Sequence, residues 1–204
     1  MRFFAQLINN FKCYICCNDG DIICDRCFLK LEFIYLNEQI CNSKVYSLLR
    51  YNQIAAKILI MSKYPPYNFY ILKFLISKLQ IPKFPKNTFF CPVPLSSLKM
   101  FERGFNQAEV IAKQISKDSS SVVNLIRRKK DTQALFSLNK IFRRIELKKA
   151  FRISLYSKII PNKQNIKIVI IDDLITTGET VTQCITVLKD EGFKDIQVLS
   201  LFRA

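Results

Sequence analysis

The chain has 204 residues, half of them hydrophobic, and its 32 Lys and Arg against 16 Asp and Glu give a formal net charge of +16. The apolar share excludes global disorder, and no uninterrupted apolar run reaches membrane-spanning length, because lysines break the richest region. We therefore expect a soluble, cytoplasmic protein with one α/β domain, a small appendage and no membrane span. The charge favours a polyanionic partner, and the alternative is a Lys-rich composition that reflects an AT-biased genome.

Near the N-terminus, the cysteines form a CxxC-x7-CxxC array. Each pair can place two thiolates on one tetrahedral ion, and the short connection between the pairs lets the segment fold back as a knuckle. The chain contains no His, so a mixed Cys/His site is excluded. We predict one structural zinc ion held by Cys13, Cys16, Cys24 and Cys27, with no open position for a substrate.

Other readings of these cysteines remain open. Cys17 could replace Cys16, although Cys16 keeps the CxxC spacing in both pairs. Disulfides would suit a secreted protein, but residues 1–10 carry neither a sustained apolar core nor a cleavage site. A redox pair is also conceivable, and two matched CxxC pairs favour zinc over it. The other single cysteines lie in apolar contexts and are expected to be small buried hydrophobes: Cys41, Cys91 and Cys184.

Hydrophobic periodicity gives a coarse view of the remaining elements. It predicts helices over 28–40, 54–61, 69–79, 106–117 and 138–149, and strands over 89–93, 122–126 and 196–202. Residues 44–50 fit a strand or the start of a helix. Strands that alternate with helices predict an α/β fold with a parallel sheet and helices on both faces.

The most informative segment covers residues 168–180. Residues 168–171 are all Ile or Val, which predicts a strand buried on both faces, and the apolar spacing after position 180 predicts a helix. Unpaired amides and the positive end of the helix dipole make the intervening loop a phosphate site. Three threonines add hydroxyl donors, and Gly178 lets the backbone approach an anion. No Lys follows this glycine, and one Gly cannot form a dinucleotide fingerprint.

Two carboxylates, Asp172 and Asp173, precede this loop, and the whole segment resembles the phosphoribosyl pyrophosphate (PRPP) loop of the type I phosphoribosyltransferases. The resemblance implies that the two carboxylates hold the ribose hydroxyls. It also implies that the 5′-phosphate is bound by Thr176, Thr177, Gly178, Glu179 and Thr180. The alternatives are a magnesium or phospho-acceptor site of a receiver-type domain, and a plain strand cap.

The middle of the chain carries two further motifs, residues 91–95 (Cys-Pro-Val-Pro-Leu) and residues 102–109 (Glu-Arg-Gly-Phe-Asn-Gln-Ala-Glu). They closely resemble the Pro-Val-Pro-Leu and Arg-Gly-Phe-Asn-Gln motifs of the ComF family. A further block with Arg127, Arg128 and Thr132 is similar to the next one in that family, but Leu135 and Glu146 stand where Gln and Asn are usual. The resemblance covers nearly the whole chain, with a zinc-binding knuckle and connecting helix over 1–42 and a phosphoribosyltransferase-like domain over 43–204.

The ComF resemblance implies a function in natural transformation, in which the protein handles incoming single-stranded DNA. It implies PRPP as ligand, Mg²⁺ bound with PRPP, Arg103 on a phosphate, and partners that include a competence helicase and other DNA-uptake proteins. The alternative is an active phosphoribosyltransferase of nucleotide or base metabolism with an unknown acceptor. Asp172 and Asp173 are the candidate catalytic residues, and Glu179 is the other candidate base.

Basic residues concentrate between positions 127 and 152. On the predicted helix, Lys140, Arg144 and Lys148 recur at i, i+4 and i+8 and so share one face. Such a stripe suits a polyanion, and the alternative is a solvated face. The residues expected to contact single-stranded nucleic acid are Arg127, Arg128, Lys140, Arg143, Arg144 and Lys148.

Overall fold

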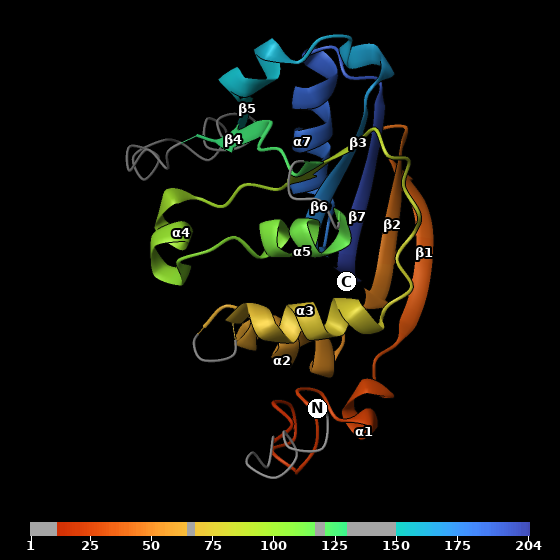
Figure 1. Ribbon diagram of the computed structural model, residues 1–204, viewed down its shortest axis with the longest axis vertical. Helices are drawn as coiled ribbons and strands as arrows, with labels where there is room; N and C mark the ends of the chain where they lie inside the picture. Colours follow the sequence, from red (N-terminus) through yellow and green to blue (C-terminus); the bar gives the residue numbers. More distant parts are fainter. Residues whose placement is uncertain (1–11, 65–67, 117–120, 130–149) are drawn as a thin grey trace, which may run out of the picture.

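A computed structural model describes residues 12–64, 68–116, 121–129 and 150–204. Five strands form a central sheet in the order β1-β2-β7-β6-β3 (Figure 1). Four of them run parallel: β2 (Ser43–Arg50), β7 (Asp195–Arg203), β6 (Lys167–Ile175) and β3 (Thr88–Pro92). The edge strand β1 (Phe33–Ile40) runs antiparallel to β2. The predicted α/β fold is confirmed, and the sheet is mixed rather than wholly parallel.

Helices cover both faces of this sheet, as the alternation of strands and helices predicts. On one face lie α5 (Gln107–Ser116), then α3 (Asn68–Lys78) and α2 (Gln53–Met61). On the other lie α7 (Glu179–Asp190) and a two-stranded ribbon of β4 (Ile126–Arg128) and β5 (Phe151–Ile153). Shorter helices complete the described chain: α1 (Asp25–Phe28), α4 (Ser97–Arg103), η3 (Leu155–Ile159) and η4 (Lys163–Asn165).

The side chains of strand β6 pack into a hydrophobic core on each face of the sheet. Ile168 and Ile170 belong to the core under α7, whereas Val169 and Ile171 belong to the core under α5. All four side chains have no exposed surface, because neighbouring residues of a strand point to opposite faces and both faces are covered. The prediction of a strand buried on both faces is therefore confirmed.

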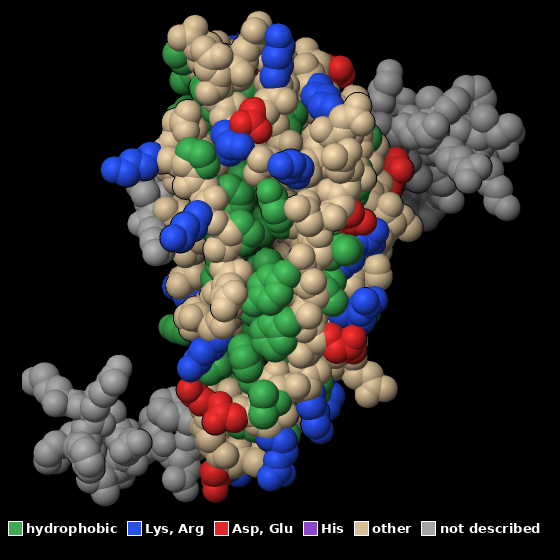
Figure 2. Space-filling model, turned by 90° about the vertical axis from the view of Figure 1, so that its right-hand side faces the viewer, with side chains coloured by type: hydrophobic (Ala, Val, Ile, Leu, Met, Phe, Trp, Pro, Cys, Tyr) green, Lys and Arg blue, Asp and Glu red, His purple; other side chains and the backbone are tan. Residues whose placement is uncertain are grey.

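The helix predicted over 28–40 is wrong. The chain leaves α1 after Phe28 and forms β1, which pairs with β2 from Leu36↔Ser47 to Ile40↔Ser43. The apolar spacing of Phe33 and Leu36 mimics a helix, but pairing with a strand that follows directly in the chain overrides it. Figure 2, which views the molecule from the β1 side, shows apolar side chains gathered on this face.

Other boundaries also differ from the sequence prediction. The strand expected over 122–126 begins only at Ile126, and Val122 forms an isolated bridge with Phe90. Helix α4 follows the Pro-containing turn, where no helix is predicted, because Ser96 accepts a hydrogen bond from the Lys99 amide and starts it. The helix predicted over 138–149 lies outside the described residues.

The division into 1–42 and 43–204 stays a prediction. Within the described ranges, no helix combines the length and the apolar character that crossing a bilayer requires.

Candidate functional site

The four predicted zinc ligands come together in one cluster. The Sγ atoms of Cys13, Cys16, Cys24 and Cys27 all lie within 4.8 Å of one another. The Sγ atoms of Cys16 and Cys24 are 3.7 Å apart. A tetrahedral ion with Zn–S bonds of about 2.3 Å requires sulfur atoms about 3.8 Å apart, so this donor set fits zinc. Cys17 is exposed and outside the cluster, which favours Cys16 as the ligand.

Backbone amides stabilise the thiolate form of one cysteine in this cluster. The amides of Cys24 and Ile15 donate to the Cys13 sulfur at 3.3 and 3.4 Å. Burial raises the pKa of Cys13, but these hydrogen bonds and those of Cys16 outweigh it and lower the pKa to about 6. Burial and its three cysteine neighbours raise the pKa of Cys27 to about 12. A cation bound among these sulfurs would stabilise the thiolates that burial disfavours.

The acidic pair lies within β6, where Asp172 and Asp173 are three and two residues before the strand ends at Ile175. Asp172 is buried opposite Ser200 of β7 and accepts the Asp173 amide at 3.0 Å. Burial, and then the neighbouring Asp173 charge, raise the pKa of Asp172 well above its ordinary value. Asp173 is only partly buried, and as its neighbour on a strand it points to the opposite face. Asp173 is therefore the more accessible carboxylate of the pair.

The predicted phosphate loop connects β6 to α7. Thr176 and Thr177 are exposed, and Gly178 adopts φ +80° as the residue before the first turn of α7. Only glycine takes this left-handed conformation without strain. Twelve residues of helix follow, so the amides of Glu179 and Thr180 lie at the positive end of a helix dipole. The loop thus has the exposed donors and the backbone shape that an anion site requires.

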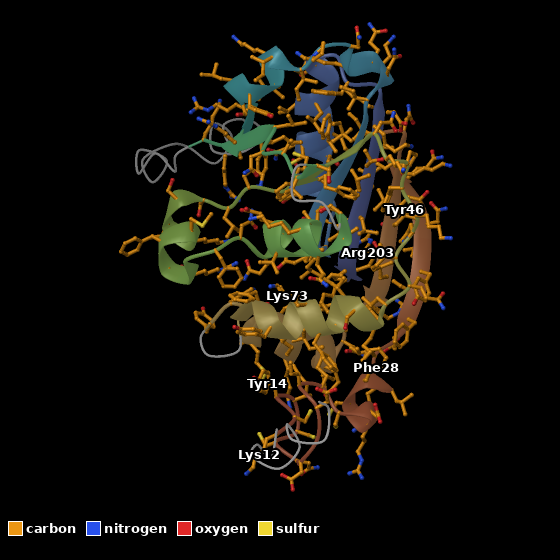
Figure 3. The ribbon with its side chains drawn as sticks, in the orientation of Figure 1. Lys12, Tyr14, Phe28, Tyr46, Lys73 and Arg203 are labelled. Carbon is orange, nitrogen blue, oxygen red and sulfur yellow. The ribbon has the colours of Figure 1, made fainter. Side chains whose placement is uncertain are left out.

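One functional candidate is missed by the sequence reasoning: Arg203, the last residue of β7. Its Nε donates to Glu38 Oε1 at 2.7 Å, and its Nη1 donates to the carbonyls of Ile175 and Thr176. Figure 3 shows Arg203 beside the carboxyl end of β7. Glu38 and Arg203 are 165 positions apart, so no local pattern in the sequence could pair them.

Lys63 is within electrostatic reach of Asp173 and of two further cations, Lys99 and Arg103 of α4. Lys63, just after α2, is partly buried, and burial lowers its pKa. The charges of Arg103 and Lys99 lower this pKa further, whereas that of Asp173 raises it. The predicted phosphate ligand Arg103 is therefore within electrostatic reach of Lys63, and its Nη1 donates to Gln107 Oε1 at 3.1 Å.

The Arg-Gly-Phe-Asn-Gln motif orients α5 toward this edge of the sheet. Asn106 caps α5, since its Oδ1 accepts the Ala108 amide at 3.0 Å. Its Nδ2 donates to the Val93 carbonyl at 2.9 Å, which ties the helix start to the turn after β3. Gly104 ends α4 at φ +74°. The hydroxyl of Ser96 caps α4 by accepting the Lys99 amide at 3.3 Å.

The basic region is described only in part. Arg127 of β4 lies directly opposite Arg152 of β5, and both are exposed. Arg128 stacks over the Phe151 ring, 5.5 Å from its centroid. The other predicted nucleic-acid residues lie outside the described ranges: Lys140, Arg143, Arg144 and Lys148. A pair of like charges across two strands is destabilising unless an anion or solvent screens it.

The chain is similar in sequence to bacterial proteins that are named for competence and for DNA utilization. It is 34% identical over 115 residues to Competence protein F of Haemophilus influenzae, an alignment that covers 55% of this chain and 49% of that protein. It is 32% identical over 117 residues to DNA utilization protein YhgH of Escherichia coli O157:H7 and of Salmonella typhi, which covers 54% of this chain and 47% of each relative. No family model matches the chain. The chain spans about half the length of these curated relatives.

Proposed function

We propose that this chain is a ComF-type protein, which binds PRPP with Mg²⁺ and acts in the handling of incoming single-stranded DNA during natural transformation; its similarity to Competence protein F and DNA utilization protein YhgH supports the proposal. We propose a cytoplasmic location for this activity. The observation that supports PRPP as the ligand is the succession along the chain of an acidic pair in β6, an exposed threonine loop and the N-terminus of α7. Each part suits a different group of PRPP.

The 5′-phosphate would bind at the loop. There the Thr176 and Thr177 hydroxyls are exposed and the amides at the start of α7 carry partial positive charge. The ribose hydroxyls would donate to Asp173, with Asp172 behind it accepting the Asp173 amide. Carboxylates are also ligands that Mg²⁺ prefers, so the same pair fits the ion that accompanies a pyrophosphate.

The pyrophosphate would extend toward the cations at the other side of Asp173. Lys63, Lys99 and Arg103 form a positive field there, and a partly buried Lys63 with a lowered pKa is stabilised when a polyanion arrives. Transfer of the phosphoribosyl group would break the bond between C1 and the pyrophosphate oxygen. This geometry would serve that step by placing and neutralising charge.

The proposed role with DNA draws on the names of the relatives and on the ribbon β4–β5. Arg127 and Arg152 present two exposed guanidinium groups on one side of the ribbon, and Lys129 extends from its end. Backbone phosphates of a single strand would relieve the repulsion between the two arginines. Such contacts carry no sequence preference.

The direct test of the ligand is calorimetric titration of the protein with PRPP and Mg²⁺. We expect saturable binding, and we expect Thr177→Val to weaken it by about 1–2 kcal/mol, roughly 5- to 30-fold in Kd, because one hydrogen bond to a charged group is lost. Thr186→Val is the matched control, since Thr186 lies further along α7 and bonds the Thr182 carbonyl of its own helix. Equal losses in both variants, or no binding by the parent protein, would contradict the proposed PRPP site.

The nucleic-acid contact is tested by titrating a fluorescent single-stranded oligonucleotide at increasing salt. Changing Arg127 and Arg152 to Ala should weaken binding and reduce the slope of log K against log salt by about 1.4, because roughly 0.7 counterions are released per phosphate contact on a single strand. The control with the same loss of charge is Lys44→Ala with Lys57→Ala, since both of these lysines are exposed. An identical salt slope in the Arg127/Arg152 variant and the parent protein would exclude the ribbon as the contact.

A further inference from the structure

The guanidinium of Arg203 donates hydrogen bonds to groups that surround the start of the phosphate loop. Nε and Nη2 donate to the two oxygens of Glu38 at 2.7 and 3.4 Å. Nη1 faces the carbonyls of Ile175 at 3.4 Å, Ala204 at 3.0 Å and Thr176. Both side chains are mostly buried, with 22% of Arg203 and 26% of Glu38 exposed. The positive charge is thus paired, and its donors are directed to protein groups.

This contact can control the direction of a backbone donor. Arg203 lies in register with Ile175, where β6 ends and the ladder with β7 stops. Thr176 is the next residue, and its carbonyl accepts from Arg203 Nη1. In a planar trans peptide, the carbonyl of one residue and the amide of the next point in opposite directions. A carbonyl held toward Arg203 therefore turns the Thr177 amide away from it.

Strand β1 supports the same loop at a second point. Ile40 approaches Gly178 so closely that an added Cβ would lie 3.0 Å from Ile40 Cδ1. Glu38 and Ile40 are two residues apart on β1 and so share one face of the strand. One edge strand thus contributes both the carboxylate that holds Arg203 and the side chain that packs against Gly178.

We infer that Arg203, held by Glu38, is a positioning residue that fixes the Thr177 amide in the orientation an anion requires. It acts through the loop backbone and is not itself a ligand of the phosphate. This inference rests on the proposed PRPP site, and it adds strand β1 as the element that preorganises the loop.

The chain offers a matched control for this ion pair. Arg50 lies beside Arg203 in the sheet register, at the same edge, and pairs with Glu32 at 3.3 Å. Both members of this control pair are more than half exposed. The Arg50→Lys and Glu32→Gln variants therefore remove an Arg–Glu contact at the same edge of the sheet, and neither residue contacts the loop in the hydrogen bonds and ion pairs of the described residues.

Two measurements test the inference on Arg203→Lys, Glu38→Gln and the control variants. The first is the affinity for ribose 5-phosphate and for PRPP with Mg²⁺, which we expect to fall about tenfold in the two test variants only, because Lys offers a point charge in place of a fork of donors. The second is amide hydrogen exchange of residues 176–180 without ligand, which we expect to accelerate only in the test variants. Thermal unfolding verifies that the compared variants are folded.

The two readouts separate the inference from the proposed function. If the parent protein binds neither ligand, the PRPP proposal fails. The rate of amide hydrogen exchange in residues 176–180 then tests the positioning role by itself. Unchanged exchange in Arg203→Lys overturns that role whatever the affinity does. If affinity falls equally in the test and control variants, a general loss of stability explains it and the inference is also overturned.

Discussion

Replacing Asp172 and Asp173 together by Ala is expected to abolish the binding of PRPP with Mg²⁺. The double change removes the carboxylate oxygens of the acidic pair, which are the proposed acceptors for the ribose hydroxyls and the proposed ligands for the ion. Each hydrogen bond between a charged group and its partner contributes about 1.5–3 kcal/mol, so two such bonds correspond to a loss of about 100-fold or more in affinity. Calorimetric titration of the parent and the double variant measures this.

The double variant should remain folded, which makes the result interpretable. Burial raises the pKa of Asp172, so the fold disfavours its ionised form, and its removal relieves that cost. Asp190→Ala serves as the control, because Asp190 is an exposed carboxylate at the far end of α7. PRPP binding by the double variant at the affinity of the parent protein would contradict the central claim about this site.

The single variants resolve the roles of the two carboxylates. Because Asp173 is the accessible member, Asp173→Ala should cost most of the affinity. Asp172→Ala should cost less, since Asp172 supports its neighbour by accepting the Asp173 amide. The opposite order would show that the buried carboxylate turns toward the ligand on binding.

The sequence predicted the centre of the fold and the local parts of the site. The run of Val and Ile in β6, the loop glycine and the apolar spacing of α7 act within about 20 consecutive residues, so local physics determines them. The CxxC pairs are equally local, and their four sulfurs come together as their spacing requires.

The features that the sequence did not predict correctly depend on contacts between distant parts of the chain. Residues 33–40 have helical apolar spacing but gain more by pairing with β2 at the edge of the sheet. Arg203 and Glu38 meet only after β1, β2 and β7 are assembled, and the charges that act on Lys63 come from other elements, Asp173 from β6 and Lys99 and Arg103 from α4. Sequence patterns can thus identify which residues carry chemistry, whereas the tertiary fold decides which residues orient them.

Replacing Cys13 by Ser is expected to remove the metal from a protein that otherwise carries about one zinc ion per chain. Cys13 is the ligand whose loss should matter most, because it is buried and its sulfur accepts the amides of both Ile15 and Cys24. The bond from Cys24 connects the second CxxC pair to the first, and the bond from Ile15 lies within the first pair, so the metal and the local fold depend on the same atom. Metal analysis of the purified parent and variant measures the loss.

The effect on folding should spread beyond the knuckle itself. Ile15, Ile23 and Leu31 are buried in the same core as residues of α2 and α3. Since binding and folding are coupled in small zinc knuckles, loss of the ion should expose this part of the core and lower the protection of residues 12–31 in hydrogen exchange. Cys17→Ser is the control, because Cys17 is exposed and lies outside the cluster, and it should keep both its zinc and its protection. Full zinc occupancy in Cys13→Ser would refute the assignment, and loss of zinc in Cys17→Ser alone would shift the ligand from Cys16 to its neighbour.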